Sequence, residues 1–510
     1  MRLTPKDSLQ EHEIERGLRA VIRDGLASQA MATLTGGAFL VAFALKLGAS
    51  NAVVGVLAAI PPLAQLLQLP SVRLVQWWGN RRRITVYFSL ISRLFWLPIA
   101  LIPWFAPGRQ GLVLLAGALG LHAIFTAVSN CAWTPWIHDL VPHDRLGSFF
   151  SKRMSWSMGL GLSLSLGAGV FVDQWGSRLP QHEIWGYSIL FAVGLVAGML
   201  GIRFLASTPE PRMHPHEREI GWLDLLRRPF RDRNFRRVVL FLGSWSFSIN
   251  LAAPFFTVYL LRELAFDLTT VVGLSALSQM ANILFFRIWG ELSDRLSNKS
   301  ILAVSGPLLL VSILGWTFTT LPGRYFLTLP LLILIHILMG VSLAGVALGS
   351  SNISLKLAPK GQATAYLATS NLVNSVSAGI APLLGGFLAD FFARRELSWT
   401  LSWSGPSADF KLQTLNFQHW DFLFFIAFLV GLYSIHCLAY VRERERGEAS
   451  EKETAQALIL EVRRSIRSLA TFGGFRALVQ FPYALARRGL KPEPARRREG
   501  KSSEKRPPEA

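Results

Sequence analysis

The sequence predicts an all-α membrane protein of twelve transmembrane helices, arranged as two pseudo-symmetric six-helix bundles. Two observations lead to this fold class: apolar residues gather in long runs, and features of the first half return in the second. Only 16% of the 510 residues are charged, whereas about 25% is usual in a soluble protein. The charged residues lie mostly between the apolar runs, as expected of a chain that crosses a membrane many times.

The internal repeat has a period of about 217 residues. Three pairs of landmarks share this spacing: Asp139–Pro142 and Lys356–Pro359, Asp173 and Asp390, and Arg82 and Lys299. A repeat of this kind indicates that the two halves share one fold. Parallel repeats of several helices that enclose a site near the bilayer midplane are an architecture of transporters.

Each apolar run is long enough for a helix to cross the hydrocarbon core, which takes about 20 residues. The spans of the first half are predicted near residues 26–47, 51–72, 84–105, 111–130, 154–172 and 184–206. Those of the second half are predicted near residues 238–261, 269–289, 300–321, 326–349, 363–389 and 422–441. The chain is thereby divided into an N-terminal segment (1–25), a first bundle (26–206), a linker (207–237), a second bundle (238–441) and a tail (442–510).

The distribution of basic residues predicts the orientation. Most of the 52 Lys and Arg residues fall on the side that also holds both chain ends, and basic residues favour the cytoplasmic side. We therefore expect a multi-pass protein of the cell (inner) membrane with both termini in the cytoplasm. The basic residues are scattered over many loops, so the net charge of +20 does not indicate nucleic-acid binding.

Two segments outside the spans have patterns of their own. In the tail, the apolar residues of Ala455–Leu469 share one helical face, which suits an amphipathic helix on anionic lipid or on a partner protein. The last 20 or so residues, rich in Lys, Arg, Glu and Pro, are expected to be disordered. The long connection 390–421 contains Trp399, Trp403 and Trp420, so we expect this loop to rest on the lipid headgroups.

A loop after the eighth span carries a recognisable motif: Gly290, Leu292, Asp294, Arg295 and Lys299. It resembles the conserved cytoplasmic loop of the major facilitator superfamily (MFS), and the resemblance covers roughly residues 20–441. The chain also resembles bacterial permeases of unassigned substrate. The resemblance implies the MFS fold, a central cavity lined by spans 1, 4, 7 and 10, and a cytoplasmic latch at Gly290, Asp294, Arg295 and Lys299.

The equivalent loop of the first half, residues 73–83, departs from the motif. It keeps the basic corner but has Arg73 and Trp77 at the positions of the motif's Gly and Asp. The resemblance therefore implies that any latch sits mainly in the second half.

Polar residues inside the spans are the candidates for a substrate pathway, because polar groups are costly in hydrocarbon and should face a cavity. The candidates are His122, Asn130, Asn250, Gln279, Asn282, His336, Asn371, Asn374, Gln29 and Gln65. Two simpler interpretations remain open: an amide can bridge neighbouring helices, and a buried histidine can be satisfied by one hydrogen bond.

Charged residues inside the spans are rarer. Arg93 is a buried charge in the third span, and it either snorkels to the interface or pairs with a carboxylate or an anionic substrate. Asp24 is placed at a span end, so no carboxylate proton relay is expected. If protons drive transport, His122 or His336 is the expected carrier, since imidazole titrates near neutral pH.

These observations favour a secondary active transporter of a small molecule, working by alternating access and driven by protons or another gradient. No nucleotide-binding motif, metal-ligand cluster or nucleophile–base pair is found in the sequence, so we expect no cofactor, no metal and no enzymatic activity. Expected partners are the substrate, the lipid bilayer and possible coupling protons, with the protein as a monomer. The alternative is a transporter-shaped sensor or scaffold that acts through its cytoplasmic tail.

Overall fold

The computed structural model describes residues 5–7, 9–106, 108–212, 229–295, 297–320, 324–357, 363–404 and 409–443. Within these residues, twelve helical segments are long and apolar enough to cross a membrane. This confirms the predicted fold class. Most of the predicted linker and nearly all of the predicted tail, including Ala455–Leu469, lie outside the described residues.

The first half contains six spans, several of them built from two helices. Its helices are α1 (Glu11–Thr35), α2 (Gly37–Lys46), α3 (Asn51–Ala64), α4 (Gln68–Trp78), α5 (Arg81–Leu94), α6 (Trp96–Phe105), α7 (Arg109–Leu140), α8 (Leu146–Arg178) and α9 (Glu183–Ser207). The first span changes direction between α1 and α2 at Gly37, whose φ of 55° lies in the left-handed region that favours glycine. A short 3₁₀ turn, Gln65–Leu67, joins α3 to α4 directly after Pro61 and Pro62.

The second half repeats this order. Its helices are α11 (Arg233–Val258), α12 (Leu268–Arg295), α13 (Asn298–Gly315), α14 (Thr328–Lys356), α15 (Ala363–Phe392) and α16 (Trp420–Ala439). A π-helical turn, Tyr259–Glu263, extends α11. A 3₁₀ turn, Trp316–Phe318, extends α13.

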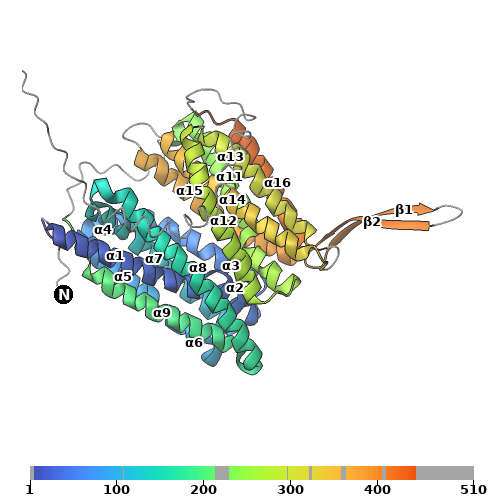
Figure 1. The fold of residues 1–510 in the computed structure, drawn as a ribbon, viewed down its shortest axis with the longest axis horizontal. Helices are drawn as coiled ribbons and strands as arrows, with labels where there is room; N and C mark the ends of the chain where they lie inside the picture. Colours follow the sequence, from blue (N-terminus) through green and yellow to red (C-terminus); the bar gives the residue numbers. More distant parts are fainter. Residues whose placement is uncertain are drawn as a thin grey trace, which may run out of the picture. The chain divides into compact units, whose positions relative to one another are not determined.

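A β-hairpin interrupts the connection between α15 and α16. Its strands β1 (Glu396–Ser404) and β2 (Asp409–Gln418) are antiparallel, with a register shift after Trp399. The hairpin corrects the expectation of a loop in this connection. Its apolar residues alternate at 397, 399, 401 and 403, which is a strand period. We call the end of the bundles that carries this hairpin the hairpin end, and the opposite end, where α1 begins, the N-terminal end (Figure 1).

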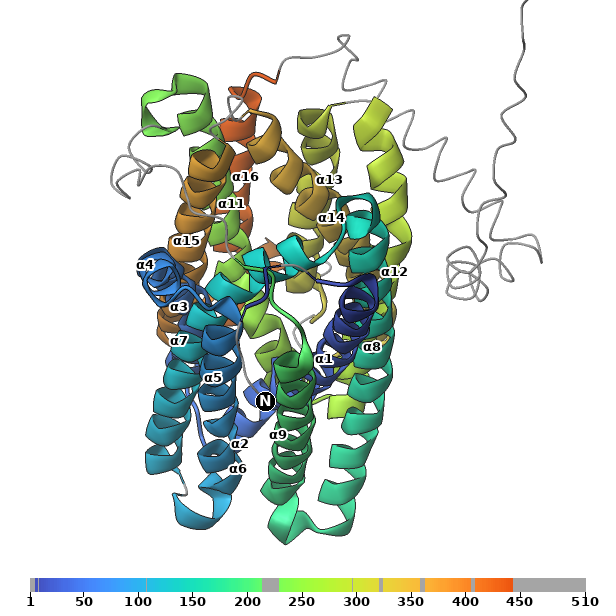
Figure 2. The ribbon, with the colours of Figure 1, turned by 90° about the vertical axis from the view of Figure 1, so that its left-hand side faces the viewer.

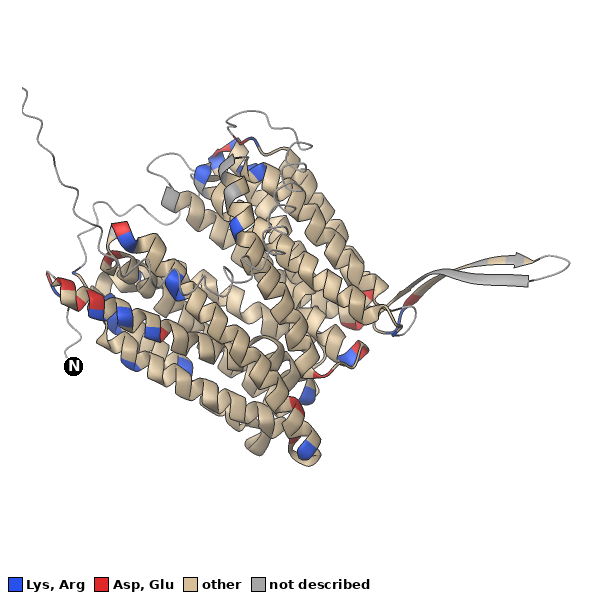
Figure 3. Ribbon diagram, viewed as in Figure 1, with Lys and Arg blue, Asp and Glu red and all other residues tan. Residues whose placement is uncertain are grey.

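Helices pack both within and between the halves. Within the halves, α1 packs on α9, α5 on α7, and α12 on α14. Between the halves, α3 packs on α15 and α8 packs on α12, and both pairs run side by side in Figures 1 and 2. Lys, Arg, Asp and Glu concentrate toward the helix ends, whereas the middle of the bundles carries few charges (Figure 3). This distribution is expected where a hydrocarbon layer surrounds the middle.

Helices α3 and α15 touch at backbone distance. A Cβ atom at Gly55 would lie 2.2 Å from the carbonyl oxygen of Pro382. Such contact between helices is possible only where a residue has no side chain.

Gly55→Ala is therefore expected to destabilise the protein by about 1–3 kcal/mol through overpacking, and to lower its melting temperature in detergent. Gly117 on α7 is the matched control, since a Cβ there would meet nothing within 4 Å. Gly117→Ala should leave stability unchanged or raise it slightly, because Ala is the better helix former. Equal melting temperatures for the two variants would contradict this account of the α3–α15 contact.

Candidate transport pathway and its two ends

Two carboxylates join the halves at the hairpin end. Asp173, near the end of α8, accepts hydrogen bonds from the backbone N–H groups of Leu268 (3.1 Å) and Thr269 (2.7 Å) at the start of α12. In the same way, Asp390 on α15 accepts from Asn51 (3.2 Å) and Ala52 (2.8 Å) at the start of α3. We call these two contacts the hairpin-end clamp.

The clamp is physically favourable because the first N–H groups of a helix have no partner within the helix and carry partial positive charge. A carboxylate that accepts two of them forms charge-assisted hydrogen bonds. Here each carboxylate caps a helix of the opposite half, so the same bonds that satisfy a helix start also hold the halves together.

The clamp follows the internal repeat on both sides. The two acceptors are repeat partners, and so are the two pairs of donors, since Asn51 and Ala52 correspond to Leu268 and Thr269. A glycine lies four residues before each aspartate, and a Cβ at Gly169 would come 3.3 Å from Thr269 Cα, while one at Gly386 would come 2.8 Å from Ala52 Cα. Each half therefore carries the same pair of residues: a glycine that allows the helices of the two halves to approach closely, and an aspartate that caps a helix of the other half.

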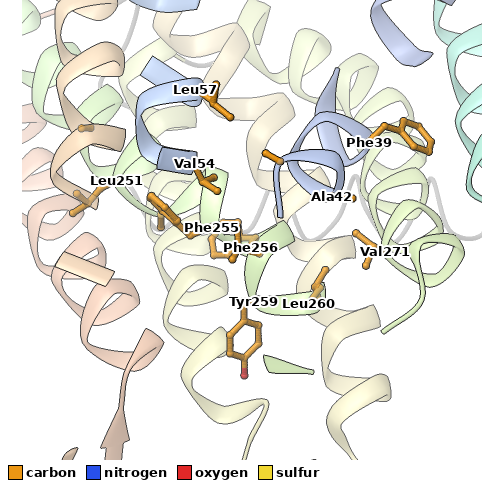
Figure 4. Packing of buried hydrophobic residues seen from close by; sticks show 14 of the residues in the cluster. Phe39, Ala42, Val54, Leu57, Leu251, Phe255, Phe256, Tyr259, Leu260 and Val271 are labelled. Carbon is orange, nitrogen blue, oxygen red and sulfur yellow. The ribbon is translucent and has the colours of Figure 1, made fainter. Parts of the chain in front are cut away.

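Apolar packing continues the contact between the halves below the clamp. Phe39 of α2 and Val54 of α3 belong to the first half, and Phe255, Leu260 and Val271 belong to the second. All five side chains are buried in one cluster (Figure 4). Arg262 adds a hydrogen bond of 2.6 Å to the carbonyl oxygen of Ala49. The two halves are thus closed against each other at the hairpin end.

At the N-terminal end, each half has a buried glutamate just after its last helix. Glu210 accepts hydrogen bonds from the backbone N–H groups of Arg81 (2.8 Å) and Arg82 (3.1 Å) at the start of α5. Glu443 accepts from the N–H of Lys299 (2.9 Å) and the amide of Asn298 (3.0 Å) at the start of α13. These contacts stay within one half, so they brace each bundle separately.

The surroundings of the two glutamates differ in charge. In the first half, Arg81 lies 2.6 Å from Asp139 and 3.5 Å from Glu210. In the second half, Lys356 stands at the repeat position of Asp139 and lies 2.7 Å from Glu443. Burial raises the pKa of Glu210 despite its hydrogen bonds. Burial also acts to raise the pKa of Glu443, but the hydrogen bonds from Lys356, Lys299 and Asn298 outweigh it and lower that pKa.

The lowered pKa of Glu443 predicts a pH dependence. A carboxylate whose pKa is lower in the folded protein stabilises it above the usual pKa near 4.5, and this stabilisation is lost as the pH falls through the folded value. We therefore expect the melting temperature of the wild type to drop more steeply on acidification below about 4.5 than that of Glu443→Gln. At neutral pH the variant should be the less stable. Glu183→Gln, at an exposed ion pair with Lys46, should follow the wild-type curve.

The latch motif is only partly described. Gly290 lies in α12, and Lys299 Nζ donates to the carbonyl oxygen of Ala439 at 3.0 Å. The side chains of Asp294 and Arg295 lie outside the described part of the chain. The described contact joins α13 to α16, both in the second half.

The two predicted histidines lie apart, each beside a tryptophan of its own half. His122 Nδ1 is 2.8 Å from Ser92 Oγ, and its ring meets Trp96 edge to face at 5.5 Å. His336 is buried, with Nδ1 2.7 Å from the carbonyl oxygen of Leu332 and its ring 5.4 Å from Trp316. Each histidine already has a hydrogen-bond partner within its half.

Four of the predicted Asn and Gln residues take part in hydrogen bonds, three through the side-chain amide and Asn374 through its backbone carbonyl. Asn250 donates to the Ser246 carbonyl at 2.8 Å, and Ser246 Oγ donates to the carbonyl of Asn374 at 3.3 Å, which brings α11 and α15 together. Asn282 bridges to the carbonyl of Gly340 on α14 at 3.3 Å. Gln29 Nε2 donates to Thr33 Oγ1 at 3.2 Å.

The other amides are more open. Gln65 hydrogen-bonds the side chain of Gln68 in the turn between α3 and α4. Asn130, Gln279 and Asn371 have exposed side chains on α7, α12 and α15. These three are available to bind a ligand without first breaking a described side-chain hydrogen bond.

A buried ion pair lies inside the first half, where the sequence analysis expected no deep carboxylate. Because α1 begins at Glu11, well before the predicted span, Asp24 lies within the helix and is only 4% exposed. Asp24 Oδ1 is 3.6 Å from Arg93 Nη2. Arg93 also donates to Ser28 Oγ at 2.8 Å and to the carbonyl of Gly198. The partner of Arg93 is therefore an intramolecular carboxylate, one of the alternatives left open by the sequence.

A second arginine approaches this pair. A Cβ at Gly25 would lie 2.6 Å from Arg153 Nε, so α8 brings a second guanidinium next to the Asp24 turn. The guanidinium carbon of Arg153 lies 5.0 Å from the centre of the Trp133 ring. Asp24 of α1 thus forms an ion pair with Arg93 of α5, and Arg153 of α8 lies close to the same turn of α1.

Two matched six-helix halves, closed against each other at one end, have the architecture of a class of membrane transporters. A family model described as Major Facilitator Superfamily matches residues 25–337. The chain belongs to this superfamily, which confirms the predicted resemblance. It is a multi-pass membrane protein of a superfamily whose members handle small-molecule substrates.

Solved structures and a curated relative agree with this assignment. The nucleoside transporter NupG has a TM-score of 0.65 at 10% identity, covering 84% of this chain and all of that chain. A D-xylose–proton symporter has a TM-score of 0.63 at 12% identity, covering 86% of this chain and all of that chain. Identities this low show the fold alone.

The multi-drug resistance efflux pump PmrA of Streptococcus pneumoniae is 28% identical over 189 residues. The match covers 35% of this chain and 41% of that pump, so the chain spans less than half the length of this relative.

Proposed function

We propose that the protein exports a small molecule across the cell membrane by alternating access, driven by a proton gradient. The hairpin-end clamp is the main support for alternating access. Its bonds form between the halves through backbone groups, so they can break and reform as the halves rock without unfolding either helix. The structure then represents a state closed at the hairpin end. The bias of Lys and Arg supports a cytoplasmic N-terminal end.

The proposed coupling site is the network of Asp24, Arg93 and Arg153. A carboxylate shared between two arginines can exchange a proton when one of them moves away, because its charge is then no longer compensated. His122 and His336 are the alternative proton carriers, but each is held by a hydrogen bond within its own half.

The proposed substrate contacts are the amides of the central spans. Asn130, Gln279 and Asn371 are exposed, and Gln29, Gln65, Asn250, Asn282 and Asn374 are proposed to complete the pathway. Neutral amides suit a substrate that offers hydrogen-bonding groups, and they do not select for its charge. The similarity to a multi-drug efflux pump supports export as the direction.

Proteoliposomes containing the full chain test the proposal. With ethidium as the probe, an imposed pH gradient should drive its movement, and Asp24→Asn should abolish uphill movement while downhill exchange persists. Arg178→Gln, at an exposed position of the hairpin end, is the control and should behave as wild type. If a pH gradient moves neither ethidium nor any of a panel of small molecules, while a sodium gradient or membrane potential does, the proposed proton coupling is wrong.

A further inference from the structure

A pocket of about 590 Å³ at the N-terminal end is lined by four arginines. Arg16, Arg19 and Arg23 come from α1 and Arg203 from α9, and Ala20, Phe204 and Ser207 complete the lining. We call it the arginine pocket. It lies wholly within the first half, apart from the proposed substrate contacts.

The sequence brings these side chains together through helix periodicity. Arg16, Arg19 and Arg23 are three and four residues apart, which places them on one face of α1. Arg203 and Ser207 are four residues apart on α9. The two helices touch closely, because a Cβ at Gly201 would lie 3.0 Å from Asp24 Oδ1. The arginines therefore stand on a rigid pair of helices.

The pocket carries positive charge without an acidic partner. None of the four arginines forms an ion pair with a carboxylate among the described residues. Two of the carboxylates in this part of the first half are paired with other arginines, Asp24 with Arg93 and Glu210 with Arg81. Arg23 lies 5.9 Å from the centre of the Phe204 ring. Four like charges around one cavity repel each other, and an anion in the pocket would relieve this repulsion.

The position along the spans indicates what kind of anion it is. Arg23 comes just before the first predicted apolar run, and Arg203 stands near the end of the sixth. The pocket thus lies where a membrane span meets the headgroup layer. Basic pockets between transmembrane helices suit the phosphate of an anionic lipid, and Phe204 and Ala20 offer apolar surface to its glycerol and acyl chain.

We propose that the arginine pocket binds the headgroup phosphate of an anionic phospholipid. The lipid would lie across α9 and α1, and α1 is the helix that carries Asp24. This site does not depend on the proposed substrate or on proton coupling.

Native mass spectrometry of the delipidated full chain tests the proposal, with phosphatidylglycerol and phosphatidylcholine as probes. The wild type should retain one phosphatidylglycerol in preference to phosphatidylcholine. Arg19→Gln/Arg203→Gln should weaken this binding about thirtyfold, because each basic residue near an anionic surface contributes about fivefold. Arg109→Gln/Arg178→Gln removes two exposed arginines of the hairpin end and should leave the binding unchanged.

Two further measurements keep the result interpretable. Arg19→Lys/Arg203→Lys should retain most of the binding, since the charge is kept. The lipid-free melting temperatures of all variants should be no lower than that of the wild type, which excludes misfolding as the cause of lost binding. Unchanged phosphatidylglycerol binding in Arg19→Gln/Arg203→Gln overturns the proposal. So does full displacement of the lipid by millimolar inorganic phosphate, which would identify a soluble phosphate as the ligand.

Discussion

Arg93→Gln is expected to lower the free energy of unfolding by about 3–5 kcal/mol, the usual cost of breaking a buried ion pair. The substitution removes the guanidinium 3.6 Å from Asp24 and one donor to the carbonyl of Gly198. The Asp24 carboxylate, which is only 4% exposed in the wild type, then loses its ion-pair partner inside the protein. Chemical unfolding in mixed micelles measures the loss.

A double-mutant cycle separates the ion pair from general packing. Asp24→Asn/Arg93→Gln should be more stable than Arg93→Gln, because no buried carboxylate that has lost its ion-pair partner then remains. Arg178→Gln is the control for removing an arginine and should stay within about 0.5 kcal/mol of the wild type. If the double variant loses the sum of the two single losses, Asp24 and Arg93 do not stabilise each other.

Removing the hairpin-end clamp should open that end of the protein. Asp173→Ala and Asp390→Ala each delete a carboxylate that accepts two backbone N–H groups, and hydrogen bonds to charged groups contribute about 1.5–3 kcal/mol each. The equilibrium ratio of closed to open protein should fall at least about tenfold with either variant, and about a hundredfold with both. Because Asp173 and Asp390 are repeat partners with equivalent contacts, the two single variants should have similar effects.

The reporter is a cysteine at Val54, which is 1% exposed in the apolar packing below the clamp. In a background without Cys131 and Cys437, Val54→Cys should react with a membrane-impermeant maleimide slowly in the wild type and faster in the clamp variants. Asp144→Ala, at an exposed ion pair with Arg145, is the matched control. Labelling that is equally slow in all variants would mean that the clamp does not hold this end closed.

The fold follows directly from the sequence because membrane insertion imposes strong local rules. A span must be long and apolar to cross the hydrocarbon, so twelve runs predict twelve helices without any knowledge of their packing. The repeat partners Asp173 and Asp390 also make equivalent contacts in the structure, since each caps a helix of the opposite half. A glycine lies four residues before each aspartate, at positions 169 and 386. This repeated spacing is the sequence pattern that could have identified the clamp.

The candidate site follows only in part. Arg93 is recognisable because a charge within an apolar run is rare, but its partner Asp24 was placed at a span end. Helix α1 continues in a polar segment that packs on α9, and hydropathy cannot detect such a continuation. Glu210 and Glu443 were missed for a related reason, because each lies in a polar stretch after a span.

The sequence by itself therefore determined the membrane class, the number of spans, the pairing of the two halves and the superfamily, since periodicity and hydropathy are properties of neighbouring residues. Only the tertiary structure decided which charges meet: Asp24 with Arg93, Asp173 with the start of α12, and four arginines around one pocket. The physical reason is that these contacts join helices far apart in the chain, and their distances depend on how side chains and glycines allow the helices to pack.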